Sequence, residues 1–238
     1  MESLLKISLI LSPPIAMHVA FTPPHTPTSD DVVHENFIEW ILFWDINYGL
    51  SITKVAFSWA IAFTELAITA SHAIDPNIFP SGLQAVIGSL RAIQDVSITS
   101  PLVFGTALIV VGGFIRWWCF RTLGRFFTFK LSVRKGHQLV TSGPYAVVRH
   151  PSYAGAALLS IGQFILHGSL SSLVRRSGVL NIPALKAIAV VVLMGRMIVV
   201  ASLILRIGPE DETVKSISRA EWENWAKVVK YRLIPGIY

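Results

Sequence analysis

Long runs of apolar residues without a formal charge constrain this chain more than any other feature. Residues 96–115 and 151–174 contain no Asp, Glu, Lys or Arg, and a helix of about 20 apolar residues is long enough to cross a lipid bilayer. Hydrophobic residues make up 53% of the 238 residues and charged residues only 14%, against about a quarter charged in soluble domains. We therefore predict an all-α, polytopic membrane protein with about five transmembrane helices and a C-terminal interfacial helix. Three further runs complete the predicted set of spans: 7–21, 55–74 and 187–205.

The first of these runs, 7–21, has two interpretations. Lys6 before a short apolar core is typical of a signal peptide, but no clear small-residue cleavage site follows. We favour a retained first helix, although two prolines lie at its centre. Residues 22–31 are polar and rich in proline, which predicts a loop. The aromatic segment 36–50 suits the membrane interface.

Basic residues gather in the middle of the chain. Residues 116–150 contain seven Lys or Arg and no Asp or Glu. Because this block lies beside apolar runs, we interpret it as a surface that faces anionic lipid rather than one that binds nucleic acid. The positive-inside rule places it in the cytoplasm. With five spans, the tail after Leu205 lies on the same side of the membrane. This topology puts the basic residues of the 168–186 connection on the non-cytoplasmic side, which is mild evidence against it. We divide the chain into N-terminal membrane helices, 1–100, and a core that carries the chemistry, 101–238.

Residues that could carry chemistry are concentrated in two stretches, 121–155 and 206–238. In the first stretch, residues 143–145 (Gly-Pro-Tyr) predict a turn. Pro151 is expected in the first turn of a helix, where its missing N–H costs nothing. His150 then lies at the positive end of the helix dipole, a place suited to an anion such as a carboxylate.

The second stretch follows the last apolar run. Arg206 is expected to close that span, and Pro209 followed by three acids is typical of a new helix start, where carboxylates favour the N-terminus. The helix predicted after them carries an apolar stripe with two tryptophans. That stripe suits a membrane interface and by itself implies no catalysis.

Taken in order, three motifs carry a family resemblance. GHQLVTSGPYAVVRHPSYAG at 136–155, then R-x3-E-D-E from Arg206 and YRLIPGIY at 231–238, together resemble the isoprenylcysteine carboxyl methyltransferases, and fungal members in particular. These enzymes belong to a wider group of membrane methyltransferases that includes the phospholipid N-methyltransferases. The resemblance covers roughly 101–238, and Val214 is a mild departure from the leucine that usually follows the acids.

The resemblance implies a site for S-adenosylmethionine and no metal. Arg206 would be the catalytic residue, binding the carboxylate of the substrate. A further polar contact before His137 would come from Lys130 or Arg134, and the residues leave this choice open. The cofactor-binding residues that the resemblance implies are His137, Gln138, Leu139, Val140, Tyr145, His150, Pro151, Ser152, Tyr153 and Glu210.

The implied reaction is methyl transfer from S-adenosylmethionine to the C-terminal α-carboxylate of prenylated cysteine in processed CaaX proteins. The family places such enzymes in the endoplasmic reticulum membrane, with the active site facing the cytoplasm. The expected partners are farnesyl or geranylgeranyl cysteine termini and membrane lipid, not nucleic acid. One alternative is a phospholipid (phosphatidylethanolamine) N-methyltransferase, whose amine acceptor would gain nothing from Arg206. The other is a non-catalytic transport or scaffold protein, which would leave the ordered motifs unexplained.

Two charged residues lie inside apolar runs. Glu65 and Arg196 each interrupt a predicted span, and ionisable residues within a membrane are candidates for function. They could instead pair with each other inside the bundle, so neither is included in the predicted site.

Overall fold

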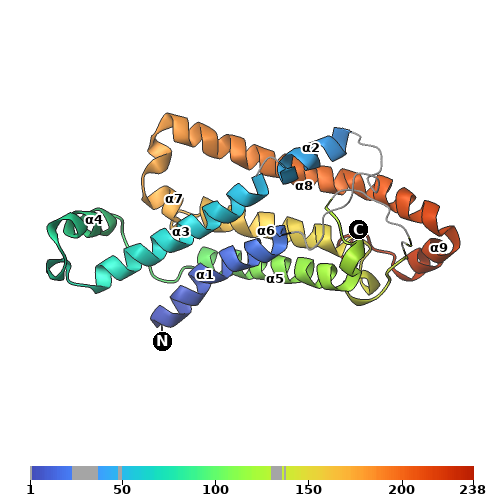
Figure 1. Ribbon diagram of the computed structural model, residues 1–238, viewed down its shortest axis with the longest axis horizontal. Coiled ribbons are helices and arrows are strands. Elements are labelled where there is room, and N and C mark those ends of the chain that lie inside the picture. The colour runs from blue at the N-terminus through green and yellow to red at the C-terminus, as the bar shows by residue number, and fades with distance from the viewer. Residues whose placement is uncertain (1, 23–36, 48–49, 130–135, 137) are drawn as a thin grey trace.

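The computed structural model describes residues 2–22, 37–47, 50–129, 136 and 138–238. All the regular structure in these residues is helical. The longer helices lie side by side in an elongated bundle (Figure 1). The helices are α1 (Glu2–Phe21), α2 (Phe37–Asn47), α3 (Leu50–Ala73), α4 (Ser81–Arg91), α5 (Ser100–Leu123), α6 (Pro151–Gly168), α7 (Leu173–Arg176), α8 (Pro183–Ile217) and α9 (Arg219–Val228), with short 3-10 turns η2 (Pro76–Ile78), η3 (Gly124–Phe126), η4 (Gly143–Ala146) and η5 (Val179–Asn181).

Each predicted span is a helix of the bundle. Four helical segments of the described chain are long and apolar enough to cross a membrane: Glu2–Phe21, Ser100–Phe126, Pro151–Arg176 and Pro183–Ile217. The predicted span 55–74 corresponds to α3, which has 24 residues but does not reach the apolar character of those four. The protein is therefore an all-α, multi-pass membrane protein, with α3 as the least apolar of the expected spans.

The helix α1 lies in the core of the bundle. Its Met17 and Ala20 are fully buried against Ile109 of α5 and Leu159 of α6. Pro13 and Pro14 stay inside the helix and are buried. The segment 7–21 thus forms one of the packed helices of the bundle.

The closest packing in the bundle joins α5 to α6 through two pairs of glycines. A Cβ added to Gly112 would lie 2.6 Å from the carbonyl oxygen of Gly155, and one added to Gly162 would lie 2.7 Å from that of Gly105. Such distances are too short for any real side chain. Small residues let transmembrane helices approach closely where the hydrophobic effect does not drive association. This contact fixes the start of α6, which carries His150 and Tyr153.

The structure contradicts the predicted helix start after Pro209. One continuous helix, α8, runs through 35 residues from Pro183 to Ile217 with Pro209 inside it. At about 1.5 Å per residue this helix is roughly 50 Å long, well beyond a hydrocarbon core of about 30 Å. Arg206 therefore does not end a helix, and Glu210 and Asp211 project from the interior of α8. An internal proline costs about 3 kcal/mol, and the ion contacts of the residues on both sides of Pro209 offset this cost.

Ion pairs form between charged residues at one end of the bundle, where α4 and α7 lie. Glu65 of α3 forms an ion pair with Arg176 of α7, and Lys6 of α1 lies 2.6 Å from Asp95. Glu65 therefore pairs with Arg176 and not with Arg196, the alternative partner that the sequence left open. Burial alone would raise the pKa of Asp95, but hydrogen bonds from Lys6 and Thr69 hold it below its ordinary value.

Both motif stretches lie at the opposite end of the bundle. There the ends of α5 and α8 meet η4, α9 and the C-terminus (Figure 1). The N-terminus points the other way, which agrees with an odd number of crossings between the two termini. The fold thus gathers residues 138–153 and 206–232 around one site.

Candidate functional site

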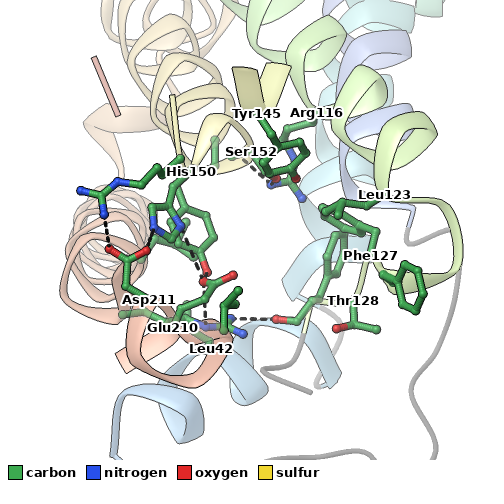
Figure 2. Close-up of a pocket in the computed structure, with 18 of the residues that line it drawn as sticks. Leu42, Arg116, Leu123, Phe127, Thr128, Tyr145, His150, Ser152, Glu210 and Asp211 are labelled. Atoms are coloured by element: carbon green, nitrogen blue, oxygen red, sulfur yellow. Dashed lines mark hydrogen bonds and ion pairs between the residues drawn. The ribbon is translucent and has the colours of Figure 1, made fainter. Parts of the chain in front are cut away.

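A cavity opens at this end of the bundle, between α5, α6, α8 and α9. Its volume is about 200 Å³, counted as the space open to the centre of a water-sized sphere. Figure 2 shows Arg116, Tyr145 and Ser152 on one side of the open space, and His150, Glu210 and Asp211 on another. The predicted site residues that line it are Gln138, Leu139, Val140, Tyr145, His150, Ser152, Tyr153, Arg206 and Glu210.

Two predicted residues stand apart from this lining. Pro151 begins α6 and is buried, so it sets the start of the helix without lining the cavity. His137 lies outside the residues that the structure describes, as do Lys130 and Arg134. The roles of these three residues, like the cofactor roles of the predicted residues that line the cavity, stay predictions.

His150 is held between two carboxylates of α8. Its Nε2 lies 3.0 Å from Asp211 Oδ1, and its Nδ1 lies 3.9 Å from Glu210 Oε2. An ionised carboxylate only accepts hydrogen bonds, so His150 donates from Nε2 to Asp211. The ring also stacks on Tyr153, with ring centroids 5.5 Å apart. Asp211 thus fixes the orientation of the imidazole beside the cavity.

Asp211 also binds two arginines, which links the site to the C-terminal segment. Arg149 Nη1 donates to Asp211 Oδ2 at 3.2 Å, and Arg232 Nε lies 3.7 Å from the same oxygen. The backbone N–H groups of Arg149 and His150 donate to the carbonyls of Tyr231 and Arg232 at 3.0 and 2.8 Å. The YRLIPGIY ending is therefore a structural partner of the RHP motif.

Arg206 already has a carboxylate partner within the protein. Its Nε lies 2.8 Å from Glu39 Oε1 of α2, and Nη1 donates to the carbonyl of Phe129 at 2.8 Å. Glu210 Oε2 lies farther away, 4.0 Å from Nε. The arginine and Glu39 are both buried. A substrate carboxylate at Arg206 would therefore share the guanidinium with Glu39 or displace it.

Two tyrosines supply hydroxyl groups to the cavity. The Tyr153 hydroxyl donates to Glu210 Oε2. Burial raises the pKa of Tyr145 well above its ordinary value, so its phenol stays neutral. Trp225 of α9 donates from Nε1 to the Tyr145 carbonyl at 3.1 Å, and Trp222 lies beneath the Arg149 guanidinium at 5.5 Å. The tryptophan face of α9 therefore closes the cavity, a role that the amphipathic pattern alone did not reveal.

Comparison with known proteins agrees with the motifs. Residues 105–216 match the Isoprenylcysteine carboxyl methyltransferase (ICMT) family, and this segment spans α5, α6 and α8 with most of the cavity wall. Residues 105–216 are therefore similar to this family.

Two curated relatives from Arabidopsis thaliana carry the corresponding name. Protein-S-isoprenylcysteine O-methyltransferase B is 38% identical over 65 residues, and the A form is 42% identical over 65 residues. Each match covers 26% of this chain and 33% of the relative. The chain thus spans about a third of the length of the curated relatives it matches. No solved structure matches the chain.

Four residues at this site were not predicted from the sequence. Arg149 and Asp211 stand inside the two motifs but looked like flanking or capping residues. Glu39 comes from a segment expected to lie at the membrane interface, and only its contact with Arg206 reveals it. Arg116 lies one residue beyond the predicted span 96–115 and was counted among the flanking basic residues.

Proposed function

We propose that this protein transfers a methyl group from S-adenosylmethionine to the C-terminal α-carboxylate of a prenylated cysteine. The observation that carries this proposal is the cavity in which the RHPSY and R-x3-E-D motifs meet, within a segment that matches the isoprenylcysteine carboxyl methyltransferase family. The names of the two relatives support the same acceptor. Processed CaaX proteins with farnesyl or geranylgeranyl termini are the proposed partners.

The residues around the cavity fit the proposed cofactor. Glu210 is a partly exposed carboxylate that can accept hydrogen bonds from amino or hydroxyl groups. Tyr145 and Ser152 offer hydroxyl groups on the other side. When bound, S-adenosylmethionine supplies an activated methyl group on a sulfonium. These side chains would bind and orient it through groups that match its donors and acceptors.

The acceptor needs no general base, because a carboxylate is already ionised near neutral pH. The work left to the protein is to align the acceptor oxygen with the methyl group and to exclude water. We assign the alignment to Arg206, since a planar guanidinium can hold a carboxylate in two parallel hydrogen bonds. Glu39 and the Phe129 carbonyl hold that guanidinium in place before the acceptor arrives.

The prenyl chain would occupy the apolar part of the same cavity. Leu159 of α6 and Val199, Val200 and Leu203 of α8 line it in the membrane-spanning portion. A prenyl group is a lipid, and burying it against such side chains is favourable by about 25 cal/mol per Å² of apolar surface. Entry from the bilayer between helices fits this arrangement.

We place the protein in the endoplasmic reticulum membrane with the cavity facing the cytoplasm. The basic block at 116–150 and the position of the motif stretches at one end of the bundle support this orientation. Cysteines placed at the exposed Ser142 and Ser216 are expected to react with an impermeant reagent from the cytoplasmic side of sealed vesicles. A cysteine at the exposed Ser177, at the far end, is expected to react only after the vesicles are opened. The single native cysteine, Cys119, is buried and serves as background. Labelling of Ser142 and Ser177 from one side would contradict the topology.

The choice of acceptor is tested by competition. Purified protein in lipid is given labelled S-adenosylmethionine together with N-acetyl-S-farnesylcysteine and phosphatidylethanolamine. We expect label in the base-labile methyl ester of farnesylcysteine and none in the phospholipid. Label in the phospholipid would support the N-methyltransferase instead. Binding of the cofactor with transfer to neither acceptor would exclude both substrates, and absence of cofactor binding would favour a non-catalytic protein.

A further inference from the structure

A second cavity lies at the other end of the bundle, between α1, α3, α6 and α7 (Figure 1). Its volume is about 70 Å³, counted in the same way as for the first cavity. A single water needs about 10–15 Å³ on this measure, so the space can hold several waters or the polar head of a ligand. Within the described chain the two cavities share no lining residue, so the second is a separate site.

The charged side chains in the wall of the second cavity already have partners. Lys6 contacts Asp95, and Arg176 contacts Glu65. Both cations of these pairs line the cavity, and each has a carboxylate beside it. A charged ligand would have to separate one of these pairs and leave a poorly solvated charge behind, which is unfavourable. The wall therefore favours a ligand whose polar part is uncharged.

Ser58 of α3 and His167 of α6 are polar side chains of the wall without a hydrogen-bond partner in the described part of the chain. Ser58 is only 5% exposed. A helical hydroxyl can satisfy itself by donating to a carbonyl one turn back, as Thr64 does to Ala60 at 2.8 Å, but Ser58 makes no such bond to a described residue. The His167 ring lies edge-on to the Phe57 ring, with centroids 5.9 Å apart. Buried polar groups normally have a partner, so these two groups require a polar ligand or water.

The remaining wall combines well with a hydroxyl-bearing amphiphile. An alcohol hydroxyl both donates and accepts hydrogen bonds, as do the Ser58 hydroxyl and a neutral imidazole. Apolar side chains from the membrane-spanning helices surround these polar groups and can contact a hydrocarbon body by the hydrophobic effect. They are Leu9, Ile10, Ile61, Leu102 and Leu166.

We propose that the second cavity binds a membrane lipid whose head is an uncharged hydroxyl, with Ser58 and His167 as its hydrogen-bond partners. Sterols and diacylglycerols share this head chemistry, and the experiment distinguishes them. A bound lipid would contact α1, α3 and α6 at the end of the bundle away from the motif residues. The inference therefore does not rest on the proposed methyl transfer.

The experiment measures how much the lipid hydroxyl contributes to binding. The purified chain in phosphatidylcholine vesicles is labelled with photoreactive cholesterol or photoreactive dioleoylglycerol, and unlabelled competitors give the affinity. The competitors are each alcohol and its methyl ether, which lacks the O–H donor. We expect the ether to compete roughly twofold to tenfold more weakly than the alcohol, as the loss of one neutral hydrogen bond predicts. Specific competition by one alcohol alone would identify the lipid as sterol or diacylglycerol, and competition by both would support the shared head chemistry.

Ser58→Ala locates the binding site. The variant should bind the alcohol roughly twofold to tenfold more weakly than the parent protein and should no longer distinguish it from the ether. Ser8→Ala is the matched control, because Ser8 lies exposed on α1, donates to the Leu4 carbonyl and does not line the cavity. It should bind like the parent protein. If Ser58→Ala keeps the full difference between alcohol and ether, the lipid binds elsewhere and the proposal is wrong.

Two results with the parent protein would also overturn the proposal, and neither depends on the folding of a variant. Equal competition by alcohol and ether would show that no hydroxyl is bound. Absence of specific labelling by both photoreactive lipids would leave the second cavity as a space for water only.

Discussion

Replacing Arg206 by lysine is expected to slow methylation of N-acetyl-S-farnesylcysteine by roughly tenfold to a hundredfold, with little change in affinity for S-adenosylmethionine. Lysine keeps the positive charge beside Glu39 but loses the planar fork. A charge-assisted hydrogen bond contributes on the order of 1.5–3 kcal/mol, and about 1.4 kcal/mol of barrier corresponds to one decade in rate. The initial rate with saturating cofactor measures the effect. Arg175→Lys, at the far end of the bundle, is the matched control.

Arg206→Ala should reduce the methylation rate further, but it also removes the arginine partner of a buried carboxylate, that of Glu39. Glu39 is 7% exposed, and removing one partner of a buried pair destabilises a protein by about 3–5 kcal/mol. The double variant Glu39→Gln, Arg206→Ala removes that penalty. If the folded double variant binds cofactor but methylates poorly, Arg206 acts on the acceptor. Methylation at the parent rate would rule out the carboxylate role of Arg206 and would favour an amine acceptor.

The membrane architecture could be predicted because hydropathy is a local property. Uncharged runs such as 96–115 and 151–174 can satisfy their backbone groups in a bilayer only as helices, and they became α5 and α6. Whereas α6 ends at Gly168, before the predicted 174, the end of α5 moved outward to Leu123 because polar residues near a membrane surface can continue the helix. The span predicted at 187–205 is part of the 35-residue α8 for this reason.

The helix start after Pro209 was predicted wrongly because the prediction used neighbouring residues only, whereas this segment also contacts distant parts of the chain. Proline followed by acids usually begins a helix, and nothing in residues 206–212 alone signals otherwise. In the folded chain Arg206 is held by Glu39, 167 positions earlier in the sequence, and Asp211 is held by Arg149. These contacts keep α8 continuous across the proline.

The candidate site was predictable where residues form a motif and not where they meet across the fold. His150, Tyr153 and Glu210 came from ordered motifs, and the structure brings them to one cavity. Arg116 and Glu39 come from segments without a motif, 90 and 167 positions before Arg206. Their relation to the site depends on how α2 and α5 pack, which single-sequence patterns do not encode.

Replacing Gly112 by alanine is expected to destabilise the protein strongly, although the same change elsewhere in a helix is neutral or favourable. An alanine Cβ at this position would lie 2.6 Å from the carbonyl oxygen of Gly155 and 2.9 Å from the backbone nitrogen of Leu159. Both are backbone atoms and cannot turn aside as a side chain does, so α5 and α6 must separate. Overpacking of this kind costs about 1–3 kcal/mol or more.

Gly195→Ala provides the matched comparison within the membrane. Gly195 lies on α8 with no atom within 4 Å of an added Cβ, and alanine is favoured over glycine in helices by about 1 kcal/mol. The two variants should therefore shift the thermal unfolding midpoint in detergent in opposite directions, downward for Gly112 and slightly upward for Gly195. Because α6 begins at the RHP motif, the separation should also weaken cofactor binding in the Gly112 variant. Equal midpoints for both variants would show that α5 and α6 do not pack through these glycines.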